Sequence, residues 1–165
     1  PTSKKGSFVI SQHDEIRDEL SDLASKALIP SAVRDEPKIY PSRPAKPMKA
    51  LEDPGNPVSR KFPQKLNDNR GEVLIRGLWA RGTDCIIDVR ITHVDAASNR
   101  SKDPQKVLLT HEREKKKKYL EACLYQRRHF TPFVVSTNGL LGREAKILLK
   151  KLSAVLAGKW QKSYS

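Results

Sequence analysis

The chain has 165 residues, a formal net charge of +13 at pH 7 and an isoelectric point near 9.9. This length suits one domain of ordinary size with appendages. The charge favours a polyanionic partner, nucleic acid first and a membrane surface second. No apolar run reaches the roughly 18 residues of a membrane-spanning helix, which excludes that class. Because the chain begins at Pro1 without Met and shows no natural stop at Ser165, we expect a fragment of a longer protein.

Two cysteines, Cys85 and Cys123, are the only ones in the chain. Both lie in apolar contexts, which predicts buried thiols rather than a disulfide, and two cysteines cannot build a zinc site. This usage fits an intracellular, reducing compartment.

The first predicted element is a helix from Ser11 to Leu28. Ser11 with Asp14 three places on resembles a capping box, and one apolar stripe follows. We expect His13 to be a first-turn residue; a metal-ligand role is disfavoured because no cysteine lies near it. The stripe consists of Ile16, Leu20, Leu23, Ala24 and Ala27.

Six prolines between Pro41 and Pro63, among scattered Lys, Arg and Gly, predict an extended linker. A proline-motif ligand for an adaptor domain is the alternative. We therefore divide the chain into an N-terminal helical segment (residues 1–40), a Pro-rich linker (41–69) and an α/β domain (70–165) that is truncated at its C-terminal end.

A β-hairpin is predicted next, with strands Glu72–Arg76 and Cys85–Thr92 rich in β-branched residues. The turn Ala80–Thr83 joins them, and Gly82 is free to take a positive φ. Period-two alternation gives the second strand two faces. Cys85, Ile87, Val89 and Ile91 share one face, and Asp84, Ile86, Asp88 and Arg90 share the other.

Two carboxylates meet if this hairpin turns near Arg81. Facing residues then have numbers that sum to about 162, so Glu72 lies beside Asp88 and Arg90. Such close carboxylates repel each other unless a cation lies between them, and Mg²⁺ (or Mn²⁺) prefers oxygen ligands. The alternative is a solvent-exposed hairpin whose Glu–Arg pair is worth only ~0.2–1 kcal/mol. Asp88 interrupts an apolar run, however, and a carboxylate there needs a partner.

A long helix is expected after the polar loop His93–Lys102. Asp103 and Pro104 provide the N-cap and first position, and the helix runs to about Arg127. Leu109, Leu120, Cys123 and Leu124 form its expected buried side. Ion pairs are predicted between Glu112 and Lys116 and between Glu114 and Lys118.

We expect most lysines of the block Lys115–Lys118 to lie on a solvated face of the helix. Helical geometry nevertheless places Lys115 and Tyr119 on one side, with Lys118 one step round. A lysine reaching the hairpin from this helix would position an attacking water or stabilise charge on a phosphate.

The last elements are an apolar strand Thr131–Thr137, expected in the sheet interior, an Asn138-Gly139 turn, and a helix Gly142–Trp160. This helix buries an apolar stripe and presents a basic outer strip. The strip either binds DNA phosphates or serves as soluble surface. The stripe is Ala145, Leu148, Leu149, Leu152, Val155 and Leu156; the strip is Arg143, Lys146 and Lys150.

The element order predicts an α/β fold, with a small mixed β-sheet flanked by helices. The hairpin resembles the core of the PD-(D/E)xK, restriction-endonuclease-like nucleases, in which two acids on neighbouring strands are followed by a basic residue. Glu72 would be the first acid, Asp88 the second, and Arg90 would replace the lysine. The chain departs from the pattern in having Glu as first acid after Gly71, and an arginine, which cannot act as a base.

A narrower resemblance rests on Glu114-Lys115-x-x-Lys118-Tyr119. This motif is similar to a helix in the endonuclease domain of non-LTR retrotransposon polyproteins, where a helix Lys and Tyr complement the two acids. The run from Lys115 into the last helix also resembles the tail of reverse-transcriptase-containing proteins of protists. The sequence His13–Arg17 looks like the His-Asn-x-x-Arg region after their zinc knuckle, whose cysteines are absent here.

The resemblance implies a nuclear, Mg²⁺-dependent endonuclease that nicks target DNA, so that the free 3′ end primes reverse transcription of element RNA. It further implies that Glu72 and Asp88 hold the metal and that Arg90 contacts the scissile phosphate. Lys115 or Lys118 would assist the water, and Tyr119 would orient either that lysine or the phosphate.

Two other classes of function stay open. A decayed copy would be a basic domain that binds nucleic acid, shows steep salt dependence and cuts nothing. A scaffold helix pair joined by a linker would instead contact an acidic protein partner.

Overall fold

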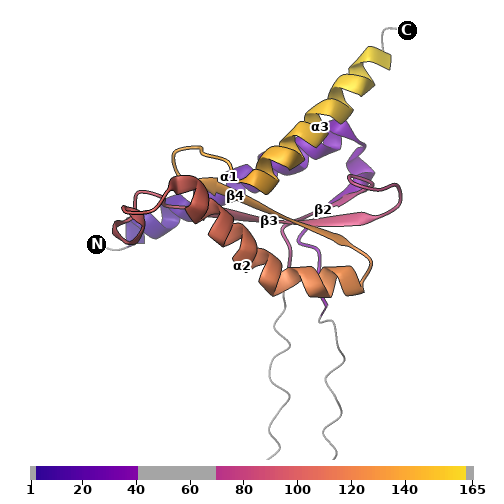
Figure 1. Ribbon diagram of the computed structural model, residues 1–165. Helices are drawn as coiled ribbons and strands as arrows, with labels where there is room; N and C mark the ends of the chain where they lie inside the picture. Colours follow the sequence, from indigo (N-terminus) through magenta and orange to yellow (C-terminus); the bar gives the residue numbers. More distant parts are fainter. Residues whose placement is uncertain (1–2, 41–69, 163–165) are drawn as a thin grey trace, which may run out of the picture.

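The computed structural model describes residues 3–40 and 70–162, which form a four-stranded mixed sheet covered by three helices (Figure 1). The sheet order is β1-β2-β3-β4. The elements are α1 (Ser3–Ala27), β1 (Val33–Asp35), β2 (Val73–Arg76), β3 (Asp84–Thr92), α2 (Pro104–Tyr125), β4 (His129–Ser136) and α3 (Arg143–Lys162), with short 3-10 turns at Pro30–Ala32 and Ala97–Asn99. None of the described helices is long and apolar enough to cross a membrane.

The predicted hairpin is present as β2 and β3, which pair antiparallel with Val73 opposite Ile87. Gly82 has the expected positive φ, at 74°. The numbers of residues that face each other sum to 160, which is two less than expected. The reason is that the connection starts at Gly77 and is longer than the predicted turn. Glu72 therefore precedes β2 at the level of Asp88 and lies farther from Arg90 than predicted.

Helices cover both faces of the sheet, as predicted. Alternate β3 residues, including Cys85, Ile87 and Val89, pack in one core with α1 and α3. Ile86 points the opposite way and packs with Tyr119 and Cys123 of α2. Both cysteines are buried free thiols, as expected.

The N-terminal helix is longer than predicted, and the proposed helix start at Ser11 is wrong because α1 already begins at Ser3. Leu20, Ala24 and Ala27 are buried in the same core as the strands. Residues 33–35 form β1, a strand that the sequence analysis missed, and it pairs antiparallel with β2. The expected N-terminal segment thus supplies a helix and an edge strand to the α/β core. The predicted linker at 41–69 lies outside the described residues.

The strand β4 lies at an edge of the described sheet, paired parallel to β3, so its expected interior position is wrong. Its residues from Phe130 to Ser136 are buried nevertheless, because α2 and α3 pack against its two faces. The apolar sequence of β4 therefore reflects burial beneath helices and not a central place in the sheet.

The two long helices after the hairpin begin close to where the sequence placed them. Asp103 caps α2 by accepting a hydrogen bond from the backbone N of Gln105 at 2.9 Å. Leu124 was expected inside but is 58% exposed. In α3 the predicted apolar stripe packs against the core, with Ala145, Leu148 and Leu152 fully buried.

Candidate functional site

The most buried charged contact of the hairpin joins Asp88 to Lys115. Asp88 occupies the middle of β3 and is 4% exposed, because Ile86 and Asp88 both point into the space beneath α2. Lys115 Nζ lies 2.5 Å from Asp88 Oδ2. That oxygen has no hydrogen bond of favourable angle, so the attraction is an ion pair. A helix amine therefore provides the partner that a carboxylate in an apolar strand requires.

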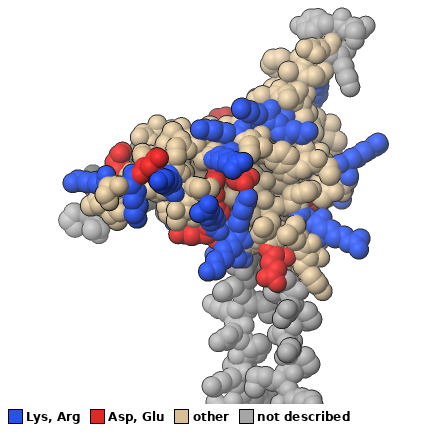
Figure 2. Space-filling model, viewed as in Figure 1, with Lys and Arg blue, Asp and Glu red and all other residues tan. Residues whose placement is uncertain are grey.

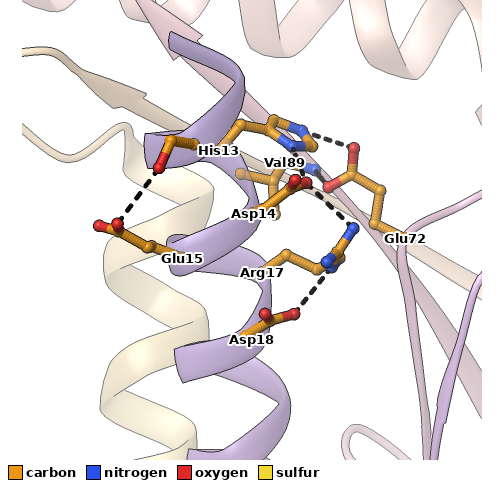
Figure 3. Close-up of polar contacts among 8 residues, drawn as sticks. His13, Asp14, Glu15, Arg17, Asp18, Glu72 and Val89 are labelled. Atoms are coloured by element: carbon orange, nitrogen blue, oxygen red, sulfur yellow. Dashed lines mark hydrogen bonds and ion pairs between the residues drawn. The ribbon is translucent and has the colours of Figure 1, made fainter. Parts of the chain in front are cut away.

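Glu72, the other acid of the predicted pair, lies in the bend before β2 and is held by α1, on the other side of the sheet. His13 Nε2 of α1 donates to Glu72 Oε1 at 2.7 Å, and the backbone N of Val89 donates to Oε2 at 3.0 Å (Figure 3). Both carboxylate oxygens are thus occupied. Gly71 permits this placement, since a Cβ there would overlap the side chain of Ile86.

The pKa of Glu72 is raised, first by burial and then by the charge of Asp88, while the contact with His13 lowers it. The two carboxylates have separate partners, one from α1 and one from α2. Each acid is therefore held by its own helix.

Arg90, two residues after Asp88, points to the surface of α2. Its Nη1 donates to Glu114 Oε2 at 2.8 Å, and His111 Nδ1 lies 3.2 Å from the same oxygen. These two cationic partners lower the pKa of Glu114. Arg90 thus neighbours the acids in sequence but contacts a glutamate of α2.

Tyr119 and the two candidate lysines, Lys115 and Lys118, all lie on α2. Tyr119 is 6% exposed, with Lys118 Nζ 4.8 Å and Lys115 Nζ 5.9 Å from its ring centroid. Lys115 reaches the hairpin through its ion pair with Asp88, whereas Lys118 lies over the ring of Tyr119. The predicted pairs of Glu112 with Lys116 and of Glu114 with Lys118 are wrong, since Lys116 pairs with Glu144 of α3 instead.

The basic strip Arg143, Lys146 and Lys150 is exposed on α3, as predicted. It belongs to a helix on the opposite face of the sheet from Asp88. Figure 2 shows Lys and Arg side chains spread over the face in view, with Asp and Glu side chains among them in several places. Basic side chains predominate on this face.

A metal site at the hairpin would have few protein ligands. In the described part of the chain, no three His, Cys, Asp or Glu side chains gather as a metal-binding cluster. Mg²⁺ typically uses one or two protein carboxylates and completes its shell with water and substrate phosphate. Glu72 and Asp88 could serve as two such carboxylates only by releasing their present partners, His13 and Lys115.

His13 is the site residue that the sequence analysis misjudged. It lies in the middle of α1, and its place in the first turn was wrong because the helix begins earlier. A usable signal existed: His13 precedes Ile16 by three positions and Leu20 by seven, so it extends the buried stripe. A polar side chain on a stripe that packs against the sheet needs a hydrogen-bond partner there, and for His13 that partner is Glu72.

Comparisons with known proteins leave the identity of the chain open. No protein-family model matches it, and a search of curated proteins gave no significant match.

Proposed function

We propose that this chain is a restriction-endonuclease-like, Mg²⁺-dependent DNA endonuclease that nicks one strand of its target. The observation that carries the proposal is the contact of Lys115 with Asp88. An acid in a central strand and an amine from the following helix form the pair that the resemblance requires. The mixed sheet with a hairpin followed by a parallel strand supports the same fold.

In this proposal Glu72 and Asp88 would hold the metal through their carboxylate oxygens, in exchange for contacts with His13 and Lys115. The ion would neutralise phosphate charge and lower the pKa of a coordinated water. Glu72 is preoriented for that task by His13 and by the backbone of Val89.

Lys115 has the central role among the chain's own cations. Its ammonium would shift from Asp88 toward the phosphate, where it stabilises charge that develops on the oxygens. The ring of Tyr119 lies beneath the lysine and limits its orientations. Arg90 contacts the scissile phosphate once it exchanges Glu114 for that stronger anion.

The wider biological role follows the resemblance. We propose that nicking opens a 3′ end that primes reverse transcription of element RNA in the nucleus, within a larger polyprotein. The exposed strip Arg143, Lys146 and Lys150 would bind DNA phosphates away from the cut.

A plasmid-nicking assay tests the proposal. Supercoiled DNA with Mg²⁺ should be converted to the open circle by the wild type, while Asp88→Asn and Glu72→Gln leave it intact. Glu121→Gln, at an exposed position of α2, is the matched control and should nick normally. Equal nicking by the wild type and Asp88→Asn would rule out the assigned site.

A specific observation favours the second candidate, a nucleic-acid-binding domain without activity. Both acids already have partners, Lys115 for Asp88 and His13 for Glu72, which is a stable arrangement for a domain that never recruits a metal. Such a domain binds DNA with steep salt dependence, and Mg²⁺ causes no cleavage. The same assay, paired with a binding titration over salt concentration, separates the two.

A further inference from the structure

An apolar groove lies on the face of the sheet opposite Asp88, where α1 borders β4 and α3 (Figure 1). Its volume is about 520 Å³. Its apolar walls come from α1, from β4 and from the region of α3. The residues are Leu20 and Leu23 of α1, Phe133 of β4, Leu141 just before α3 and Leu149 within it. Leu20 and Phe133 form the buried floor, whereas Leu23 and Leu149 remain half-buried at the opening.

The rim of this groove is acidic. Glu15, Glu19 and Asp22 line its edge, and their spacing of four and three residues places them along one side of α1. All three are exposed, and Lys26 pairs with Asp22 at 2.6 Å. Glu15 and Glu19 have no ion pair among the described residues. In a chain of net charge +13 this edge repels nucleic acid and attracts cations.

The groove is elongated along α1. A smaller hollow of about 210 Å³ shares Glu15, Ile16 and Val135 with it and continues to Gln12. From Gln12 to Lys26 the helix rises roughly 20 Å, which is about four turns of a second helix laid beside it. A long apolar floor with charge along one edge suits a helix better than a compact small molecule.

We propose that this groove binds an amphipathic helix of a protein partner whose polar face is basic. The apolar side of that helix would cover Leu23 and Leu149, and its lysines or arginines would lie against Glu15 and Glu19. Charge complementarity selects the basic partner, because an acidic helix would place like charges against the rim. This surface is independent of the proposed nuclease, whose acids lie at the hairpin.

Fluorescence anisotropy with the full chain tests the proposal. The probe is a labelled synthetic peptide with leucines on one helical face and lysines on the other, and its partner probe replaces each lysine by glutamate. We expect the lysine peptide to bind and the glutamate peptide to remain free. The double variant Glu15→Lys/Glu19→Lys should weaken binding at least about tenfold.

Matched controls make each outcome decisive. Glu121→Lys reverses an exposed acid of α2, away from the groove, and should leave peptide affinity unchanged. An unchanged thermal midpoint for the double variant shows that its fold is intact, since both glutamates are exposed. Equal binding of the two peptides, or full affinity in the double variant, would overturn the proposal. Self-association of the chain that the double variant abolishes would also overturn it, by making a second copy the occupant.

Discussion

The two acids of the hairpin are stabilised in different ways. Asp88 lies inside β3 at 4% exposure and has the ammonium of Lys115 as its charged partner. Glu72 lies at the strand end with its side chain 20% exposed, and accepts hydrogen bonds from His13 and a backbone amide. The comparison shows two ways of holding a carboxylate in this fold: an opposite charge close to Asp88, and hydrogen bonds together with partial exposure for Glu72. Lys115 therefore stabilises the fold, in addition to the chemical role that we propose for it.

Removing Lys115 should have the largest effect. Lys115→Ala leaves Asp88 as an uncompensated buried charge, and we expect a loss of about 3–5 kcal/mol in the free energy of unfolding. Urea denaturation at neutral pH measures it.

Two companion variants sharpen that experiment. Adding Asp88→Asn to Lys115→Ala removes the orphaned charge and should restore much of the stability. Lys118→Ala is the matched control, because Lys118 is exposed and contacts the ring of Tyr119. If Lys115→Ala were no less stable than Lys118→Ala, the buried ion pair would not be what compensates Asp88.

A smaller change is expected for His13→Ala. Glu72 keeps its bond to Val89 and partial exposure, so the loss of one hydrogen bond to a carboxylate should cost about 1–2 kcal/mol. Removing this orienting contact should also weaken metal binding by roughly 10–100-fold. Calorimetric titration with Mn²⁺ provides the measurement.

His111→Ala is the control for that variant. His111 also contacts a glutamate, but Glu114 is 54% exposed and lies on α2. Its removal should leave metal affinity unchanged. A similar loss in both variants would show that the effect on Glu72 is not specific.

A third buried acid, Glu112, tests the role of a charged partner. It is 2% exposed and accepts a hydrogen bond from the backbone N of Glu144 at 2.8 Å, without an ion pair in the described residues. Burial raises its pKa above the ordinary 4.5. A raised pKa in the folded state means that wild-type stability declines as pH rises from about 4.5 through the folded value.

Glu112→Gln removes this pH dependence while keeping a hydrogen-bond acceptor. We expect the variant to gain stability relative to the wild type as pH increases across that window, by a smaller amount than either change above. Urea midpoints at a series of pH values measure it. Parallel curves for the two proteins would contradict the assignment.

The hairpin, the flanking helices and the buried stripes of α1 and α3 could be predicted from periodicity. The predicted buried side of α2 was partly wrong, because Leu124 is exposed while Val107 and Leu108 are buried. Alternation in β3 is strong because Cys85, Ile87 and Val89 face one core and Ile86 the other. Local pattern could not reveal β1, since three residues carry little periodic signal and the strand exists through pairing with Val73–Ile75. Local pattern also could not locate β4 at the edge, because helices bury it as thoroughly as neighbouring strands would.

The candidate site was predictable in part. A carboxylate within an apolar run indicated that Asp88 needs a partner, and helical spacing brought Lys115 and Tyr119 together. The choice between Lys115 and Lys118 depends on how α2 is rotated over the sheet, which is a tertiary property. The contact of His13 with Glu72 joins residues 59 positions apart through the packing of α1, and no local rule fixes it.

Metal binding tests the central claim most directly, because it does not depend on finding the right DNA. Mn²⁺ should be titrated into the full chain with a short DNA duplex present, followed by electron paramagnetic resonance of the free ion. The account predicts a site in the wild type that disappears in Asp88→Asn and is retained in Glu121→Gln. Identical Mn²⁺ binding by the wild type and Asp88→Asn would contradict it.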